Sequence, residues 1–195
     1  MWPWGHAAFG YILYSLGSRA VRGRPPDGPS VFVLLIATQL PDLVDKPLAW
    51  GLGLFPQGYA VGHSAFVAVP VGLLALLLGV RVDRRELGVA FVIGYWSHLA
   101  GDVVAPLATG DGFGVERVLW PLVTLPEYGT EYTMFERVNV YLSAFLELLS
   151  TSEQIGVLMV YFGPFLAAFV LWIVDGAPGV ATLRRAVVGI DCRGR

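Results

Sequence analysis

Long apolar stretches, each interrupted by only a few polar residues, recur along this sequence. The clearest run from Val61 to Val80, from Leu87 to Leu107 and from Ile155 to Val174. Each approaches the roughly 20 residues that a helix needs to cross a hydrocarbon core about 30 Å thick. Two further apolar segments are less regular, since residues 5–16 are short and residues 31–50 turn polar halfway. The pattern predicts five transmembrane helices.

The connection before the last of these segments, residues 106–154, has a different pattern. Its first half is rich in Gly and Pro. In its second half apolar residues recur at helical spacing, at Phe135, Val138, Leu142, Phe145 and Leu149. This spacing predicts a helix over residues 132–149 that lies on the bilayer surface or caps the bundle.

The predicted fold class is therefore all-α, a polytopic membrane helix bundle of about five transmembrane helices plus an extracytoplasmic amphipathic helix. Residues 1–195 are expected to form a single membrane-embedded domain. The composition agrees, because 55% of residues are hydrophobic, 14% are charged and the mean hydropathy is +0.64, outside the range of ordinary soluble domains. No positive charge precedes the first apolar segment and no small-residue cleavage site follows it, so no cleavable signal peptide is expected.

Charge further narrows the partners that we expect. A net charge of -2 offers no basic field for nucleic acid. Membrane lipid is the expected partner, with a lipid also as the candidate substrate. The single cysteine, Cys192, lies in a polar tail and is assigned no role.

Basic residues are distributed unevenly between the two sides of this bundle. Ten of the thirteen follow the first, third or fifth apolar segment: Arg19, Arg22, Arg24, Arg81, Arg84, Arg85, Arg184, Arg185, Arg193 and Arg195. Lys46, Arg117 and Arg137 fall on the other side. Because short loops rich in Lys and Arg stay in the cytoplasm, we expect a multi-pass protein of the cell membrane. Its amino terminus would be extracytoplasmic and its carboxyl terminus cytoplasmic.

Six ligand-type side chains interrupt the apolar segments at one expected level, toward the extracytoplasmic side. They are His6, Asp42, Asp45, His63, His98 and Asp102. An unpaired Asp at the centre of a spanning helix costs about 2.5 to 3.5 kcal/mol, and less near the interface. A divalent cation offsets this cost, because imidazole and carboxylate are ligands that zinc and manganese accept. The predicted cofactor is zinc, as one or two ions, with manganese as the alternative.

The spacing of His98 and Asp102 is the most specific part of this set. Residues four apart share one helix face, about 5 to 6 Å from each other. They can therefore bind one metal or flank a pair. Ser64 and Ser97, each next to a candidate ligand, are candidate donors to an imidazole or carboxylate, although small hydroxyls also pack between membrane helices.

Each residue also has a simpler explanation on its own. A histidine near a helix end is commonly an interfacial or hydrogen-bonded residue. Asp42, next to Pro41, can cap a helix, and Lys46 can neutralise Asp45. The simpler explanations fit the complete set less well than they fit its members.

The motifs GHAAFGY, LPDLVD, GHS and HLAGD, between His6 and Asp102, resemble the YdjM-like family of membrane-bound, predicted metal-dependent hydrolases. Their order is also similar to part of the ligand set of bacterial zinc-dependent phospholipase C. The resemblance implies five metal ligands: His6, Asp42, His63, His98 and Asp102. It departs at residues 58–60, where many family members carry HRG and this chain has GYA. A third zinc would need a carboxylate of the outer loop, from Glu127, Glu131 or Glu136.

The leading hypothesis is a metal-dependent hydrolase that acts on phosphoesters, such as lipid headgroups, at the extracytoplasmic leaflet. Asp45 or Asp102 would accept the proton of the attacking water. The alternatives are a divalent-metal transporter, since His-x-x-x-Asp pairs also form transport sites, and a structural metal that holds the bundle together.

Overall fold

A computed structural model describes residues 2–128, 132–150 and 154–191, and every regular element within these ranges is helical. The elements, in chain order, are α1 (Pro3–Arg22), α2 (Gly28–Ala37), α3 (Leu40–Lys46), the π-helical turn η1 (Pro47–Gly51), α4 (Ala65–Arg81), α5 (Arg85–Val104), the 3-10 turns η2 (Ala105–Thr109) and η3 (Val115–Val118), α6 (Met134–Leu149), α7 (Gln154–Val174) and α8 (Val180–Asp191). The all-α prediction is therefore confirmed for the described part of the chain.

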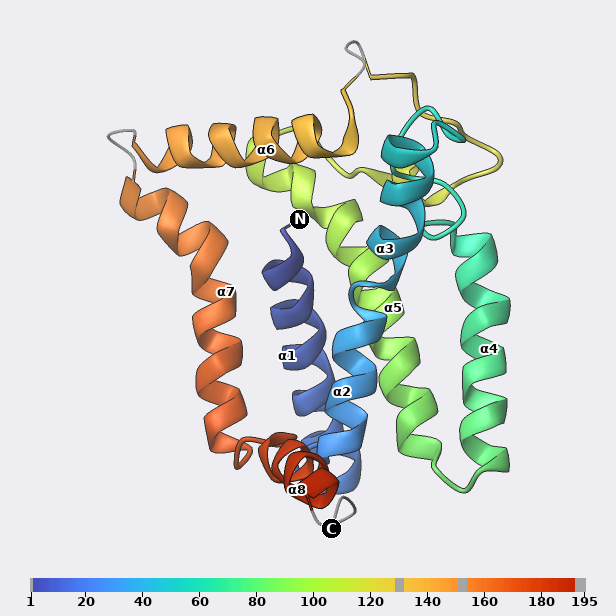
Figure 1. The fold of residues 1–195 in the computed structure, drawn as a ribbon, viewed down its shortest axis with the longest axis vertical. Helices are drawn as coiled ribbons and strands as arrows, with labels where there is room; N and C mark the ends of the chain where they lie inside the picture. The colour runs from blue at the N-terminus through green and yellow to red at the C-terminus, as the bar shows by residue number, and fades with distance from the viewer. Residues whose placement is uncertain (1, 129–131, 151–153, 192–195) are drawn as a thin grey trace.

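Five of these helices, α1, α2, α4, α5 and α7, run roughly side by side (Figure 1). α5 is central, because it packs against α1, α2 and α4, and α7 packs against α1. α6 lies across the end of the bundle where α1 begins, and α8 lies across the opposite end (Figure 1). The end under α6 holds α3, the first turn of α1 and the last turns of α5, which are the segments that carry the candidate ligands.

One helix within the described residues is long and apolar enough to cross a membrane by length and composition. It is the continuous helical segment of 24 residues from Arg85 to Ala108, which has a mean hydropathy of 1.4 and a window that is 50% buried. The segments Ala65–Arg81 and Leu158–Val174 are apolar but shorter. The count of five crossings and the orientation of the termini stay predictions.

The helix expected over residues 31–50 is two helices instead. α2 ends at Ala37, and α3 begins at Leu40, after two intervening residues, with Pro41 in its first turn. A proline inside a helix removes a backbone hydrogen bond and its ring clashes with the carbonyl four residues earlier, here that of Ala37. The break displaces Asp42 and Asp45 from the line of α2 and lets α3 approach α5.

Other boundaries also differ from the pattern. The helix expected from residue 61 begins at Ala65, because the backbone N–H groups of residues 60, 62 and 63 bind the Asp45 carboxylate. α6 confirms the amphipathic helix, and a capping box between Thr133 and Glu136 fixes its first turn. These hydrogen bonds from Thr133 hold the pKa of the Glu136 carboxyl below its usual range. α8 is an element that the pattern did not predict.

Glycines let α1, α2 and α5 approach closely where the candidate ligands emerge. A Cβ atom at Gly94 would lie 2.6 Å from the Leu34 carbonyl oxygen, and one at Gly10 would lie 2.6 Å from Thr38 Cγ2. Small residues at such crossings are typical of packed membrane helices. Gly10 lies one turn after His6 and Gly94 lies one turn before His98, so the same crossing brings the two imidazoles together.

The far end of the bundle is held by a buried carboxylate, Asp175, just after α7. Asp175 Oδ2 accepts hydrogen bonds from the hydroxyls of Tyr11 and Ser15, both at 2.6 Å. Its Oδ1 accepts a hydrogen bond of 2.8 Å from Arg19 Nε. Because all three donors belong to α1, this cluster joins α1 to α7 and has no metal-ligand character.

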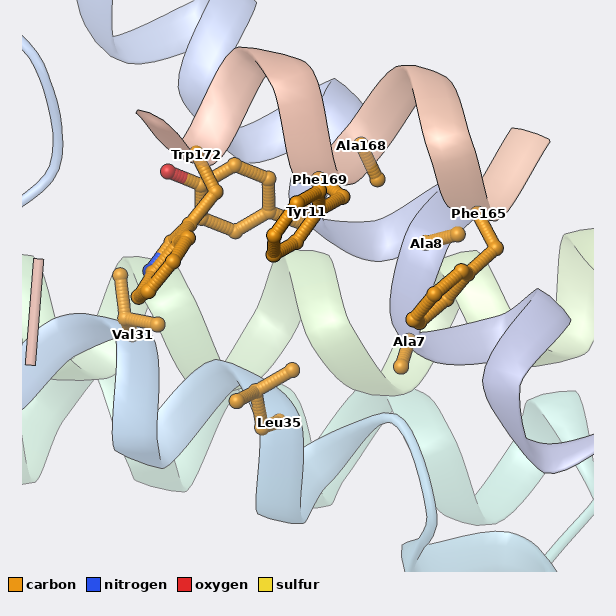
Figure 2. Close-up of a pocket in the computed structure, with 9 residues that line it drawn as sticks. All are labelled: Ala7, Ala8, Tyr11, Val31, Leu35, Phe165, Ala168, Phe169 and Trp172. Carbon is orange, nitrogen blue, oxygen red and sulfur yellow. The ribbon is translucent and has the colours of Figure 1, made fainter. Parts of the chain in front are cut away.

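A small apolar cavity of about 140 Å³ lies between α1, α2 and α7 (Figure 2). In Figure 2 the side chains of Phe165, Phe169 and Trp172 on α7 face Ala7 on α1 and Val31 and Leu35 on α2. Apart from the Tyr11 hydroxyl, which is held by Asp175, the lining carries no acid, base or nucleophile. The chemistry of the molecule therefore lies elsewhere.

Candidate metal centre

The six candidate side chains meet at the end of the bundle covered by α6. His6 comes from the first turn of α1, Asp42 and Asp45 from α3, His63 from the loop before α4, and His98 and Asp102 from the end of α5. All are buried except Asp42, whose side chain is 11% exposed. The structure thus brings together all six, and in its described part Asp42 is the one member of the set that is partly exposed.

Two of the three imidazoles are held so that the same ring nitrogen faces the cluster. His98 Nδ1 donates to the Thr38 carbonyl oxygen at 2.6 Å. His63 Nδ1 donates to Asp45 Oδ2 at 2.8 Å. In both rings this leaves Nε2 as the inward atom with its lone pair, the tautomer that a metal ligand needs. The two Nε2 atoms are 3.1 Å apart, a close approach of two lone pairs that a shared cation would stabilise.

The inward nitrogens of His63 and His98 lie at metal-ligand spacing from each other and from the nearest oxygens of Asp42 and Asp102. His63 Nε2 lies 3.4 Å from both Asp42 Oδ1 and Asp102 Oδ2. His98 Nε2 lies 3.7 Å and 3.4 Å from the same two oxygens. A tetrahedral zinc site with bonds of about 2.0 to 2.1 Å has donors about 3.3 to 3.4 Å apart. The spacings therefore fit a divalent cation held by Asp42, His63 and His98, with Asp102 in the neighbouring group that it forms with His6 and His98.

His6 extends the cluster toward a second group of donors. Its Nε2 lies 3.4 Å from Asp102 Oδ1, the oxygen that does not face His63. Its ring stacks on that of His98, with centroids 3.6 Å apart. Both ring nitrogens of His6 are buried and make no hydrogen bond within the described structure. A buried imidazole without a hydrogen bond is costly, and a metal held by His6, His98 and Asp102 would remove that cost.

The charges of the cluster also suit a divalent cation. The three carboxylates contribute three negative charges, and Lys46 forms a direct ion pair with one of them. That pair is with Asp42, four residues earlier on the same helix face. The expectation that Lys46 neutralises Asp45 is wrong, because Lys46 pairs with Asp42, and the buried Asp45 carboxylate accepts N–H groups of residues 60, 62 and 63 instead.

Asp45 is an anchor for the loop that carries His63. Its Oδ2 accepts from the backbone N–H of Ala60 at 2.7 Å and of His63 at 2.9 Å, and its Oδ1 accepts from Gly62 N–H at 2.8 Å. With His63 Nδ1–H, four donors occupy the carboxylate. Gly62 is required here because a Cβ atom would lie 2.8 Å from the Pro41 carbonyl oxygen.

Ser64 and Ser97 do not donate to the cluster. The Ser64 hydroxyl donates to the Trp120 carbonyl oxygen at 2.6 Å, and the Ser97 hydroxyl donates to the Gly94 carbonyl oxygen one turn earlier at 2.8 Å. Ser64 thereby joins the start of α4 to the outer loop. Ser97 packs at the crossing of α1 and α5.

The remaining candidates from the outer loop lie apart from the donors. Neither Glu127 nor Glu136 belongs to the two groups of donor atoms found in the described residues, and Glu136 is engaged by Thr133. Glu131 and Cys192 lie outside the described residues. The described structure therefore supplies donors for two groups and leaves a third zinc without support.

Two residues near the cluster carried no signal in the sequence. Tyr59, in the place where the resemblance leads one to expect an arginine, contacts the His63 ring edge-on at 4.8 Å between centroids. The guanidinium of Arg117, from η3, lies 5.3 Å above the Tyr59 ring. Burial, reinforced by the charge of Asp102, raises the pKa of the Tyr59 phenol and keeps it neutral. The Thr38 carbonyl, which orients His98, was equally unpredictable, because any residue supplies one.

Comparison with known proteins decides the family. Residues 1–177 match the family described as YdjM inner membrane protein. The chain belongs to the YdjM inner membrane protein family. Membership of this family indicates a membrane location and confirms the resemblance seen in the motifs. No curated protein and no solved structure matches the chain, and the likeness to phospholipase C stays a prediction.

Proposed function

We propose that this YdjM-family protein is a membrane-embedded, metal-dependent hydrolase that acts on phosphoesters, such as lipid headgroups, at the extracytoplasmic leaflet. The observation that carries the proposal is the spacing of His63 Nε2, His98 Nε2 and Asp42 Oδ1, which lie 3.1 to 3.7 Å from one another and can hold one metal ion with a coordination position left for water. A divalent cation bound there supplies a water of lowered pKa and stabilises charge on the phosphoryl oxygens. Zinc is the expected ion, with manganese as the alternative.

The side chains of the cluster would have different roles in this reaction. His6, Asp42, His63, His98 and Asp102 would hold the metal, through one group of donors or through two that share His98. Asp45 orients His63, because four N–H groups already occupy its oxygens. Of the two carboxylates expected to accept a proton from water, Asp102 is thus the remaining candidate, and the partly exposed Asp42 marks the side from which a substrate enters.

The position of the cluster supports this function over ion transport. Transport sites lie near the middle of the membrane, commonly between internal repeats. Here the donors come from the first turn of α1 and the last turns of α5, at one end of the bundle (Figure 1). That depth suits a substrate at the level of lipid headgroups.

The test combines metal analysis with turnover. Zinc content is measured in the purified protein and in the variants His98→Ala and Asp102→Asn, with Asp27→Asn as a matched control, since Asp27 caps α2 far from the cluster. Release of phosphate or headgroup from defined lipids is then measured with and without chelator. We expect zinc binding and chelator-sensitive turnover in the native protein and in Asp27→Asn, and loss of both in the two ligand variants.

Three results would contradict the proposal. Unchanged zinc content in both ligand variants would remove the site. Tight zinc binding with no turnover across a broad lipid panel would indicate a structural metal. Zinc flux into proteoliposomes that fails in His98→Ala, again without turnover, would indicate a carrier.

A further inference from the structure

We infer that Lys46 and Arg117 form a pair of anion-binding side chains, the phosphoryl clamp, which holds the non-reacting oxygens of a phosphoryl group against the metal centre. The inference rests on the proposed function and names the part of the substrate that is recognised. It assigns a role to two of the three basic residues that the sequence places at this end of the molecule.

Lys46 lies beside Asp42, the partly exposed member of the cluster. Its ammonium group binds Asp42 Oδ2 and lies 5.4 Å from the centre of the Trp50 ring. The other oxygen of Asp42 faces His63, so the ammonium group is separated from the donor atoms by one carboxylate. An ammonium group has three N–H donors, and its contact with Asp42 uses one. With 29% of its side chain exposed, Lys46 can present the others to an incoming anion.

Arg117 approaches the cluster from the outer loop. Its Nη1 donates to the Asp102 backbone carbonyl oxygen at 3.3 Å, and its guanidinium stacks on Tyr59, which in turn contacts His63. No carboxylate within the described residues lies at ion-pair distance from Arg117. A guanidinium has five N–H donors in a fork that matches phosphate oxygens. One hydrogen bond to a carbonyl leaves most of that fork for a ligand.

Lys46 thus adjoins the cluster at the Asp42 carboxylate, and Arg117 adjoins it at the Asp102 backbone. The three carboxylates of the cluster disfavour a bound anion. A divalent cation adds two positive charges to the same groups and so favours one. The clamp therefore requires the metal, and an anion would replace neither cation's existing contact.

The test measures binding rather than turnover. Inorganic phosphate, and separately phosphatidic acid in detergent micelles, are titrated calorimetrically into the zinc-loaded protein. The variants are Lys46→Gln and Arg117→Gln, which keep an N–H donor for Asp42 and Asp102 but lose the charge. Arg24→Gln is the control, because Arg24 pairs with Glu86 at the opposite end of the bundle.

We expect each variant to retain zinc and to lose affinity for the phosphoryl ligand by about tenfold or more, as for lost charged hydrogen bonds, while Arg24→Gln binds as the native protein does. Weakening in both arms assigns recognition to the phosphoryl group alone. Weakening confined to phosphatidic acid assigns it to a lipid headgroup, and weakening confined to inorganic phosphate assigns it to a soluble source.

Other results overturn the inference. The first is that the zinc-loaded native protein binds neither phosphate nor phosphatidic acid. The second is that either variant binds the phosphoryl ligand with unchanged affinity. The third is that the variants lose zinc, which would show that the two residues support the metal instead. The inference and the proposed function can fail separately. Clamp-dependent binding without any turnover refutes the function alone, and chelator-sensitive turnover with the same KM in both variants refutes the clamp alone.

Discussion

The role of Asp45 can be tested by the smallest change that removes its charge, Asp45→Asn. The native carboxylate accepts three N–H donors at Oδ2 and one, from Gly62, at Oδ1. An amide has one oxygen and one NH₂ group. Its better orientation places the oxygen at the Oδ2 position, so that the NH₂ group faces Gly62 N–H and that donor loses its acceptor.

Two effects of different size follow. A buried N–H left without an acceptor costs about 1 to 3 kcal/mol, which lowers the stability of the metal-free protein. Loss of the carboxylate behind a ligating histidine typically lowers metal affinity about 10- to 100-fold. We therefore expect zinc affinity to fall within that range, and the metal still to bind, because His63 keeps its place through the remaining hydrogen bonds.

Competition with a chromophoric chelator, in detergent, measures the zinc affinity. Asp27→Asn is the matched control, since it makes the same chemical change at a helix cap where the side chain accepts only from Ser30. Thermal unfolding in excess chelator separates the loss of stability from the loss of affinity. If Asp45→Asn binds zinc as tightly as Asp27→Asn does, the carboxylate does not support His63 as a ligand and the reasoning is refuted.

Three other outcomes are expected. Gly62→Ala places a Cβ atom 2.8 Å from the Pro41 carbonyl oxygen and should lower zinc affinity. The control Gly17→Ala, whose Cβ atom would have nothing within 4 Å, should leave it unchanged. Equal zinc affinities of the two variants would show that the loop before α4 accommodates the added Cβ atom. Asp175→Ala should lower the free energy of unfolding by about 3 kcal/mol and leave zinc affinity unchanged. The value is the lower end of the range for a broken buried ion pair, because Arg19 is partly exposed. Loss of the zinc site would contradict the separation of the two ends of the bundle. Zinc at a hundred times its dissociation constant should stabilise the native protein by about 2.7 kcal/mol, and a melting temperature of His98→Ala that rises equally would place the metal elsewhere.

Some features of the fold follow from the sequence because they are local. Apolar runs predict helices, and α4, α5, α6 and α7 begin and end within a few residues of the predicted bounds. The break between α2 and α3 is also a local feature, because Pro41 causes it. Hydropathy alone did not reveal the break, since apolar residues lie on both sides of it. The start of α4 was not encoded locally. Residues 60–63 stay outside the helix because Asp45, from another element, accepts N–H groups of this segment.

The sequence by itself determined which residues can bind a metal. Imidazole and carboxylate groups are expensive in an apolar bundle unless something compensates them, and the spacing of His98 and Asp102 places both on one helix face whatever the fold. Residue type and periodicity are properties of the chain, so these conclusions needed no coordinates.

Only the tertiary structure decided what each of those residues does. The packing of α1, α3, α5 and the outer loop decides these roles. It turns Asp42 toward the donors and Lys46, and Asp45 toward the loop. It also directs one oxygen of Asp102 to His63 and the other to His6, and brings Arg117 to the cluster. Contacts between residues far apart in the chain depend on the distances and directions set by all the packed helices together. A local pattern contains no record of them.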